Sequence, residues 1–268
     1  MLLRDKINNF EINYYIEDIQ NDKPTVLFLH GFADSYRTFI KLFNSNEYNS
    51  VAIDFPGCGQ SVYNNELKIE DYQNLVEEFI NKNFSNKNIF IVSHSLGSAS
   101  ALYALKNNKN VKYCLLIAPF NYLIANDYEH VQIMSNRLLP KTFENIYESY
   151  TSLFYNPSEL VKNAAERRAI SFETISKQRL NNFEYMVKNQ ILNKEYNNSI
   201  KELFAQKNYS IISGFEDKFV PINDLKQVIL DNNYIDLEII SNCGHATIYE
   251  GYNNVKNKIS QMLKSGKL

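Results

Sequence analysis

The fold is decided by the stretch Ile89-Phe90-Ile91-Val92-Ser93-His94-Ser95-Leu96-Gly97. Its first four residues are apolar, and most of them are β-branched, which is typical of a buried strand. The apolar run ends abruptly at Ser93, and the small residues from Ser98 to Leu102 then favour a helix. A strand, a sharp turn and a helix are therefore expected in that order, with Ser95 at the apex. Such a turn holds one hydroxyl out at the end of a buried strand, where a base can reach it.

This turn matches the pattern G-x-S-x-G, the nucleophile elbow, with one exception. Ser93 stands where the pattern has its first glycine, and Gly97 keeps the second. The position two before the nucleophile has to be small because the strand and helix backbones approach closely there, and serine can meet that demand. An ordinary strand-to-helix turn that contains serines is the alternative interpretation of this stretch.

Four other turns each follow a short apolar run that is typical of a strand. In chain order they are His30-Gly31-Phe32, then Phe55-Pro56-Gly57-Cys58-Gly59-Gln60-Ser61 after Asp54, then Phe215-Glu216-Asp217-Lys218-Phe219-Val220-Pro221, and finally Cys243-Gly244-His245. In a parallel sheet, loops that follow strands meet at the carboxyl edge of the sheet. We therefore expect these turns to lie near Ser95.

This ordered set of turns resembles the α/β-hydrolase family, from about residue 25 to the C-terminus. The order serine, aspartate, histidine is also the order of that family. The resemblance implies two sets of site residues. They are a catalytic triad of Ser95, Asp217 and His245, and an oxyanion hole formed by the backbone N–H groups of Phe32 and Leu96.

The choice of His245 as the base is also favoured by elimination, because the chain has only four histidines. His130 has no motif around it. His94 lies inside the elbow, where its ring cannot face the hydroxyl of its own neighbour in the required way. His30 belongs to the His-Gly turn, where we expect its ring to hydrogen-bond loop backbone.

The acid has more rivals than the base. Glu216 is adjacent to Asp217, and Asp224 is either a helix-start residue or an alternative acid. Some members of the family carry the acid after the sixth strand, but Pro119-Phe120-Asn121 at that place offers no carboxylate. We expect Asp54 to organise the Pro-Gly turn rather than to act in catalysis.

Strands and helices alternate along most of the chain. Strands are expected at 2–7 and 10–16, joined as a hairpin at Asn8-Asn9, and at 25–29, 51–54, 89–93, 111–117, 209–213 and 235–240. Helices are expected near 36–43, 70–83, 96–107, 223–230 and 246–264. This alternation predicts an α/β fold with a mainly parallel eight-stranded sheet and helices on both faces.

The pattern changes after the sixth strand, because strand signals vanish between Phe120 and about Asn198. Helices are expected at 144–154 and 172–189, and another is expected to start with Asn156 as N-cap and Pro157 as its first residue. The family carries its lid at this place. We therefore expect an α/β-hydrolase core at 1–120 and 199–268, and a helical cap at 121–198.

Composition sets limits on partners and compartment. The net charge of −2 gives no electrostatic reason to expect nucleic acid. No apolar leader follows the first residues, and no stretch is apolar enough to span a membrane, so neither a signal peptide nor a membrane span is expected. Cys58, Cys114 and Cys243 lack disulfide-like or metal-like spacing. This favours a reducing cytoplasm. No metal or cofactor is expected.

The predicted activity is hydrolysis of a carboxylic ester with a small to medium acyl group, through an acyl-enzyme on Ser95. The expected partner is a small-molecule ester. Two alternatives stay open. One is an aminopeptidase similar to proline iminopeptidases, which needs acidic groups in the cap to hold an ammonium; Glu144, Glu148, Glu159, Glu166 and Glu173 are available there. The other is a non-catalytic small-molecule binder on the same scaffold.

Overall fold

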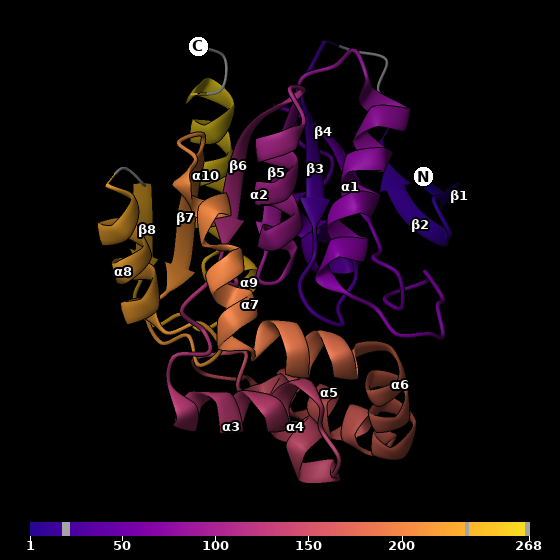
Figure 1. Cartoon of the computed structure of the whole chain (residues 1–268), viewed down its shortest axis with the longest axis vertical. Coiled ribbons are helices and arrows are strands. Elements are labelled where there is room, and N and C mark those ends of the chain that lie inside the picture. Colours follow the sequence, from indigo (N-terminus) through magenta and orange to yellow (C-terminus); the bar gives the residue numbers. More distant parts are fainter. Residues whose placement is uncertain (18–21, 234–235, 266–268) are drawn as a thin grey trace.

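The computed structural model describes residues 1–17, 22–233 and 236–265. Within these residues the strands form one eight-stranded sheet in the order β1-β2-β4-β3-β5-β6-β7-β8 (Figure 1). The strands are β1 (Leu2–Ile7), β2 (Phe10–Ile16), β3 (Thr25–Leu29), β4 (Asn49–Ile53), β5 (Ile89–His94), β6 (Val111–Ile117), β7 (Tyr209–Gly214) and β8 (Asp236–Ile240). The first two pairings, β1 with β2 and β2 with β4, are antiparallel, and the other five are parallel. The predicted fold class is therefore confirmed.

A few expected positions cannot be compared with the structure. Position 235, the expected first residue of the last strand, lies outside the described residues, as do positions 18–21 and 266–268 of the expected core. The expected hairpin is present, with Ile7 paired to Phe10. Asn8 turns the chain there with a φ of 53°, a left-handed conformation that asparagine adopts more readily than most residues.

The two faces of the sheet are covered by different helices, and alternate residues of each strand pack against one set of helices or the other. In β5, Ile89 and Ile91 belong to one apolar core and Phe90 and Val92 to the other, because successive side chains point to opposite faces. The first core contains residues of α1 (Ile69–Phe84), α2 (Gly97–Asn107) and α8 (Ile222–Asn232). The second contains residues of the 3-10 helix η1 (Tyr36–Leu42), α9 (Thr247–Glu250) and α10 (Tyr252–Ser265). Both faces of β5 are thus buried.

The chain between β6 and β7 is helical, and its described residues contain no strand. Its helices are α3 (Tyr128–Leu138), α4 (Phe143–Thr151), α5 (Glu159–Ala169), α6 (Phe172–Tyr185), the π-helix η2 (Met186–Ile191), α7 (Lys194–Ser199) and the 3-10 helix η3 (Lys201–Ala205). Figure 1 shows α3 to α6 gathered beyond the carboxyl ends of the parallel strands. We call residues 121–198 the helical segment.

The helix that was expected to start at Asn156 begins two residues later, so this prediction is wrong. Ser158 is the N-cap, and its side chain accepts a hydrogen bond from the N–H of Val161. The N–H of Asn156 is instead directed to the carboxylate of Glu250, at 3.4 Å. A tertiary contact therefore engages the N–H of Asn156 ahead of the helix, and Ser158 caps the helix instead.

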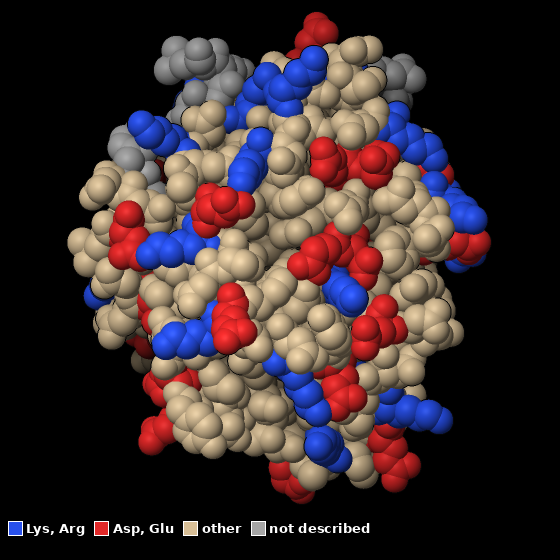
Figure 2. Space-filling view, viewed as in Figure 1, with Lys and Arg blue, Asp and Glu red and all other residues tan. Residues whose placement is uncertain are grey.

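The apolar character of the helices and the distribution of surface charge are relevant to binding of membranes and nucleic acids. None of the helices in the described part of the chain combines the length and the apolar character that a membrane span needs. On the face shown in Figure 2, acidic and basic side chains are interspersed, and neither sign forms an extended region.

The helix α2 approaches β3 so closely that its first residue has to be glycine. A Cβ atom at Gly97 would lie 2.6 Å from the carbonyl oxygens of both Leu29 and His30. On the other side of the turn, Ser93 stands at the position that is usually glycine. Its hydroxyl has a hydrogen-bond partner, because its Oγ lies 3.2 Å from Oγ of Ser98. The strand-turn-helix unit is therefore fixed by backbone contact on one side and by a buried hydroxyl pair on the other.

We predict that Gly97→Ala lowers the free energy of unfolding by about 1–3 kcal/mol, because the methyl group displaces α2 from β3. Thermal unfolding followed by circular dichroism should show a Tm several degrees below that of the wild type. Lys106→Ala is the matched control on the same helix, because its exposed ion pair with Glu202 contributes little. An unchanged Tm for Gly97→Ala would contradict the close approach.

Candidate active site

Ser95 lies at the apex of a strained turn between β5 and α2. Its φ is 49°, a left-handed conformation that costs energy for a residue other than glycine. The surrounding backbone holds it there, because its N–H donates to the carbonyl of Ile117 at 2.9 Å and its carbonyl accepts from the N–H of Phe120 at 3.1 Å. The Ser95 hydroxyl makes no hydrogen bond with another described residue. It is therefore free to contact a ligand.

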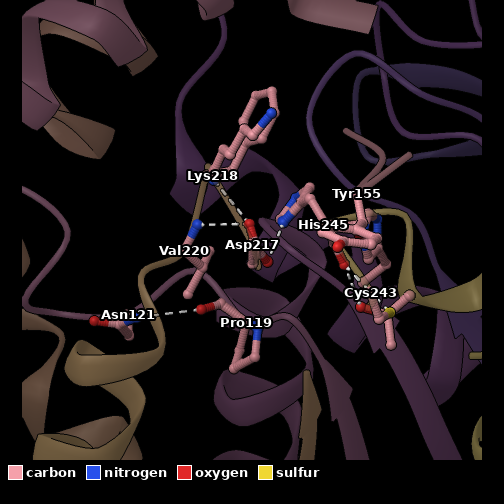
Figure 3. A network of polar contacts seen from close by, with 12 residues as sticks. Pro119, Asn121, Tyr155, Asp217, Lys218, Val220, Cys243 and His245 are labelled. Carbon is pink, nitrogen blue, oxygen red and sulfur yellow. Dashed lines mark hydrogen bonds and ion pairs between the residues drawn. The ribbon is translucent and has the colours of Figure 1, made fainter. Parts of the chain in front are cut away.

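Asp217 and His245, expected on separate loops, form a buried pair (Figure 3). Nδ1 of His245 donates to Oδ2 of Asp217 at 2.8 Å. The other carboxylate oxygen, Oδ1, accepts the N–H groups of Phe219 and Val220 at 2.7 and 2.9 Å. Three donors thus bond one carboxylate. The bond from Nδ1 places the proton of His245 on that nitrogen and leaves Nε2 as a proton acceptor.

Neither of the two rival carboxylates bonds the ring of His245. Oε2 of Glu216 accepts the N–H of Cys243 at 2.9 Å, and the N–H of Glu216 donates to the carbonyl of Cys243 at 3.0 Å. Glu216 therefore holds the loop that carries His245 without bonding its ring. Asp224 lies in the first turn of α8 and makes no hydrogen bond with His245. Burial, with a smaller contribution from Asp127, raises the pKa of Asp224 to about 6.

His30 bonds loop backbone, as the sequence predicts. Its Nδ1 donates to the carbonyl of Gly31 at 2.7 Å, and its Nε2 accepts the N–H of Phe55 at 3.0 Å. Both nitrogens of this fully buried ring are used. The ring therefore ties the turn after β3 to the turn after β4.

The two remaining histidines support the acid and histidine loops. Nε2 of His94 donates to the carbonyl of His245 at 3.0 Å, and burial, together with the neighbouring His245, lowers the pKa of His94. His94 is therefore neutral at neutral pH. Nε2 of His130, on α3, donates to the carbonyl of Phe219 at 3.2 Å. Among the four histidines, His245 is the one whose ring bonds a carboxylate.

The turn predicted to form half of the oxyanion hole lies directly against the elbow. A Cβ atom at Gly31 would lie 3.0 Å from Nδ1 of His94 and 3.1 Å from Cβ of Ser95. The backbone N–H groups of Phe32 and Leu96 donate to no acceptor among the described residues. Two unengaged donors thus belong to the two turns that meet at Ser95.

Asp54 has the organising role that the sequence predicts for it. Its two carboxylate oxygens accept the N–H groups of Tyr36 and Gln60, each at 2.8 Å. Its backbone carbonyl accepts the hydroxyl of Ser61 at 2.8 Å. Asp54 therefore fixes the Pro-Gly turn and the start of η1, and it does not contact His245.

A cavity of 510 Å³ opens beside these residues, and Phe32, Ser95, Leu96 and His245 all line it. The helical segment supplies much of the remaining wall, mostly with apolar side chains. Three aromatic residues of this segment line the cavity. They are Tyr150, Phe154 and Phe183. This volume suits a small-molecule ligand.

The helical segment also holds the histidine loop, which the sequence did not indicate. The carbonyl of Leu153 accepts the N–H of Ala246 at 2.7 Å. The carboxylate of Glu250 accepts the N–H of Gly244 at 2.8 Å and that of Tyr155 at 3.1 Å. The segment after α4 and the loop around His245 are therefore one hydrogen-bonded unit. No local motif marks Glu250, because its partners Tyr155 and Asn156 are distant in sequence.

Three arginines of the cavity wall were also missed. They are Arg137, Arg168 and Arg179, from α3, α5 and α6. The five glutamates considered for an ammonium site do not line the cavity. Within the described residues, no group of three or more His, Cys, Asp or Glu side chains could hold a metal ion.

Comparison with known proteins agrees with this architecture. "Putative esterase/lipase 1" of Mycoplasma pneumoniae is 30% identical over 155 residues, which is 54% of this chain and 54% of that protein. "Putative esterase/lipase 3" of Mycoplasma genitalium is 24% identical over 254 residues, covering 92% and 89% of the two chains. The match to the first relative thus spans about half of its length, and the match to the second spans most of it.

The solved structures give the same fold. The crystal structure of a membrane phospholipase A superposes with a TM-score of 0.78 at 18% identity, over 100% of this chain and 86% of that chain. At this identity the likeness concerns the fold alone. A family model of the alpha/beta hydrolase fold matches residues 24–252. The chain therefore belongs to the α/β-hydrolase fold family.

Proposed function

We propose that this protein is a serine hydrolase that cleaves a carboxylic ester of a small to medium acyl group through an acyl-enzyme on Ser95. The observation that carries the proposal is the 2.8 Å bond between His245 and the buried Asp217, beside a cavity that Ser95 also lines. The names of the two mycoplasma relatives are consistent with this activity.

The proposed reaction has two halves. His245 takes the hydroxyl proton of Ser95 through Nε2 while Oγ attacks the ester carbonyl, and the N–H groups of Phe32 and Leu96 bind the developing oxyanion. The C–O bond then breaks, and the alcohol leaves with the proton from His245. A water molecule attacks the acyl-enzyme, His245 takes its proton and returns it to Ser95, and the carboxylic acid departs. Asp217 stabilises the imidazolium in both halves.

The proposal requires the Ser95 hydroxyl and His245 to come into contact during the reaction. They share no hydrogen bond in this structure. Catalytic hydrogen bonds of this kind are often long without substrate and shorten in the complex. Substrate that fills the cavity leaves the hydroxyl fewer directions in which to point, which favours the bond to Nε2.

We assign the helical segment, residues 121–198, as a cap over a core formed by residues 1–120 and 199–268. Its side chains account for about half of the apolar residues that line the cavity. A cover of this kind excludes water and shapes an acyl pocket. Because Leu153 also bonds the backbone of Ala246, the cap supports the histidine loop as well as selecting substrate.

The two alternative functions predict different behaviour in simple assays. An aminopeptidase needs a carboxylate to hold the substrate ammonium, whereas the cap contributes arginines to the cavity. A series of 4-nitrophenyl esters of increasing acyl length, with a prolyl arylamide beside it, separates ester from amide cleavage. A binder would react with a fluorophosphonate but turn over neither substrate.

The cysteines support a reducing compartment, and we propose the cytoplasm. Cys58, Cys114 and Cys243 are all free and buried. Burial raises the pKa of each thiol, which keeps it protonated and unreactive. None of the three is therefore assigned a role in the reaction.

We predict that Ser95→Ala lowers kcat for a 4-nitrophenyl ester by roughly a million-fold, because the hydroxyl is the attacking group. The measurement is the rate of nitrophenol release by the purified variant. Its thermal unfolding curve, compared with that of the wild type, serves as the control for folding. Turnover within tenfold of the wild-type rate would contradict the assignment of Ser95.

We also predict that Asp217→Asn lowers kcat by about ten-thousand-fold, because the amide favours the wrong tautomer of His245. Glu216→Gln is the matched control on the adjacent residue. Its amide oxygen can still accept the N–H of Cys243, so its rate should stay close to that of the wild type. If Glu216→Gln or Asp224→Asn were the damaging change instead, Asp217 would not be the acid.

A further inference from the structure

The cavity wall formed by the helical segment is cationic. Arg137, Arg168 and Arg179 line it, and Asp34 is the one carboxylate among the lining residues. Oδ2 of Asp34 accepts the hydroxyl of Thr38 at 2.6 Å, on the core side of the cavity. The arginines come from α3, α5 and α6, and no carboxylate of the helical segment lines the cavity beside them.

Arg179 is a buried cation without a carboxylate partner, since only 8% of its surface is exposed and it forms no ion pair with a described residue. Its Nη1 donates to the carbonyls of Arg137 and Leu138 at 3.3 and 3.1 Å, at the end of α3. These bonds use one of its three nitrogens, and a guanidinium has five N–H donors. Burial lowers the pKa of Arg179; the neighbouring Tyr150, which also hydrogen-bonds this side chain, opposes that shift, and Arg168 adds to it. A buried charge of this kind is costly unless a partner compensates it.

Arg137 is buried to the same degree and is also incompletely compensated. Its Nη1 donates to the carbonyl of Lys218 at 2.8 Å. Its Nη2 lies 3.3 Å from the carboxylate of Glu148, which is 58% exposed and screened by solvent. Its Nε is buried and has no hydrogen-bond partner. One donor of this side chain therefore has no partner among the described residues.

Each guanidinium packs against an aromatic ring that is close to a group of the proposed reaction. Arg179 is 5.7 Å from the ring centre of Phe32, whose N–H is a proposed oxyanion donor. Arg137 is 5.2 Å from the ring centre of Phe219, and that ring stacks on His245 at 4.9 Å. The two arginines also contact each other, because Arg179 donates to the carbonyl of Arg137. Both arginines therefore line the same cavity as Ser95 and His245.

We propose that Arg179 and Arg137 form a subsite for an anionic group of the ester substrate, a carboxylate or a phosphate. This inference rests on the proposed function and narrows its substrate class. Carboxylate and phosphate oxygens match the fork of a guanidinium, which binds them through paired hydrogen bonds. Arg168, exposed at the rim and 4.7 Å above the ring of Tyr150, adds positive charge at the cavity mouth.

The test compares an anionic ester with a neutral ester that has the same number of acyl carbons. The substrates are mono-4-nitrophenyl glutarate and 4-nitrophenyl pentanoate. We expect Arg179→Gln to lower the ratio of kcat/KM for glutarate to that for pentanoate by at least about tenfold. Arg179→Lys keeps the charge and should lose less. A merely structural role at the end of α3 would change both substrates alike and leave the ratio unchanged.

Arg167→Gln is the matched control, because Arg167 precedes Arg168 on α5, is exposed and does not line the cavity. Its ratio should equal that of the wild type. If Arg179→Gln does not fold, the same ratio is measured for Arg137→Gln. Inhibition of the wild-type enzyme by free glutarate is then measured as well. Free glutarate should then inhibit pentanoate turnover at lower concentration than neutral glutaramide.

A second pair of substrates separates the two sources of the anion. It compares a 1-acylglycerol 3-phosphate with the monoacylglycerol of the same acyl chain. If Arg179→Gln lowers the anionic-to-neutral ratio of kcat/KM for this pair alone, the subsite binds a phosphate on the alcohol side of the ester. If it lowers the ratio for the glutarate pair alone, the subsite binds a carboxylate on the acyl side. Ratios unchanged in both pairs, with pentanoate still hydrolysed, would overturn the subsite and leave the proposed function standing. A wild type that hydrolyses neither 4-nitrophenyl ester would instead overturn the proposed function.

Discussion

The structure depends on one tight backbone contact, where α2 begins against the end of β3. Gly97 permits that contact, and the turn before it holds Ser95 at a positive φ. The cost of this conformation is offset by hydrogen bonds from the elbow to the backbone beyond β6. The same geometry leaves the N–H of Leu96 unengaged at the start of α2. A strained turn thus exposes one hydroxyl and one donor at a single point.

The loops that follow β7 and β8 are fixed relative to that point by polar contacts. His94, inside the elbow, bonds the carbonyl of His245, so the elbow and the histidine loop are joined directly. Glu216 and Glu250 fix the same loop from two other sides. The helical segment takes part in this network through Leu153, and it is therefore coupled to the loop that carries His245. Changes of the helical segment that preserve residues 153–156 should be tolerated better than changes within them.

Local sequence patterns predict the structural features that are determined by residues a few positions apart. The strands, the elbow and the turns around His30 and Asp54 could be predicted because periodicity, glycines and small residues act within a few positions. The start of α5 could not, because the N–H of Asn156 bonds Glu250, which is distant in sequence. The cavity positions of Arg137 and Arg179 could not be predicted either, because an arginine within a helical stretch indicates only that this part of the helix is polar. Their place in the cavity follows from how α3 and α6 pack, and no single segment of sequence encodes that packing.

The central claim is that Ser95 forms a covalent acyl-enzyme, and peptide mapping tests it most directly. The protein is mixed with a 4-nitrophenyl ester, quenched with acid within the first turnover, and digested for mass spectrometry. The account predicts one acyl group per chain, on the peptide that contains Ser95, together with a burst of one equivalent of nitrophenol. Turnover without any acyl group on Ser95, or an acyl group on another residue such as Cys58, would contradict it.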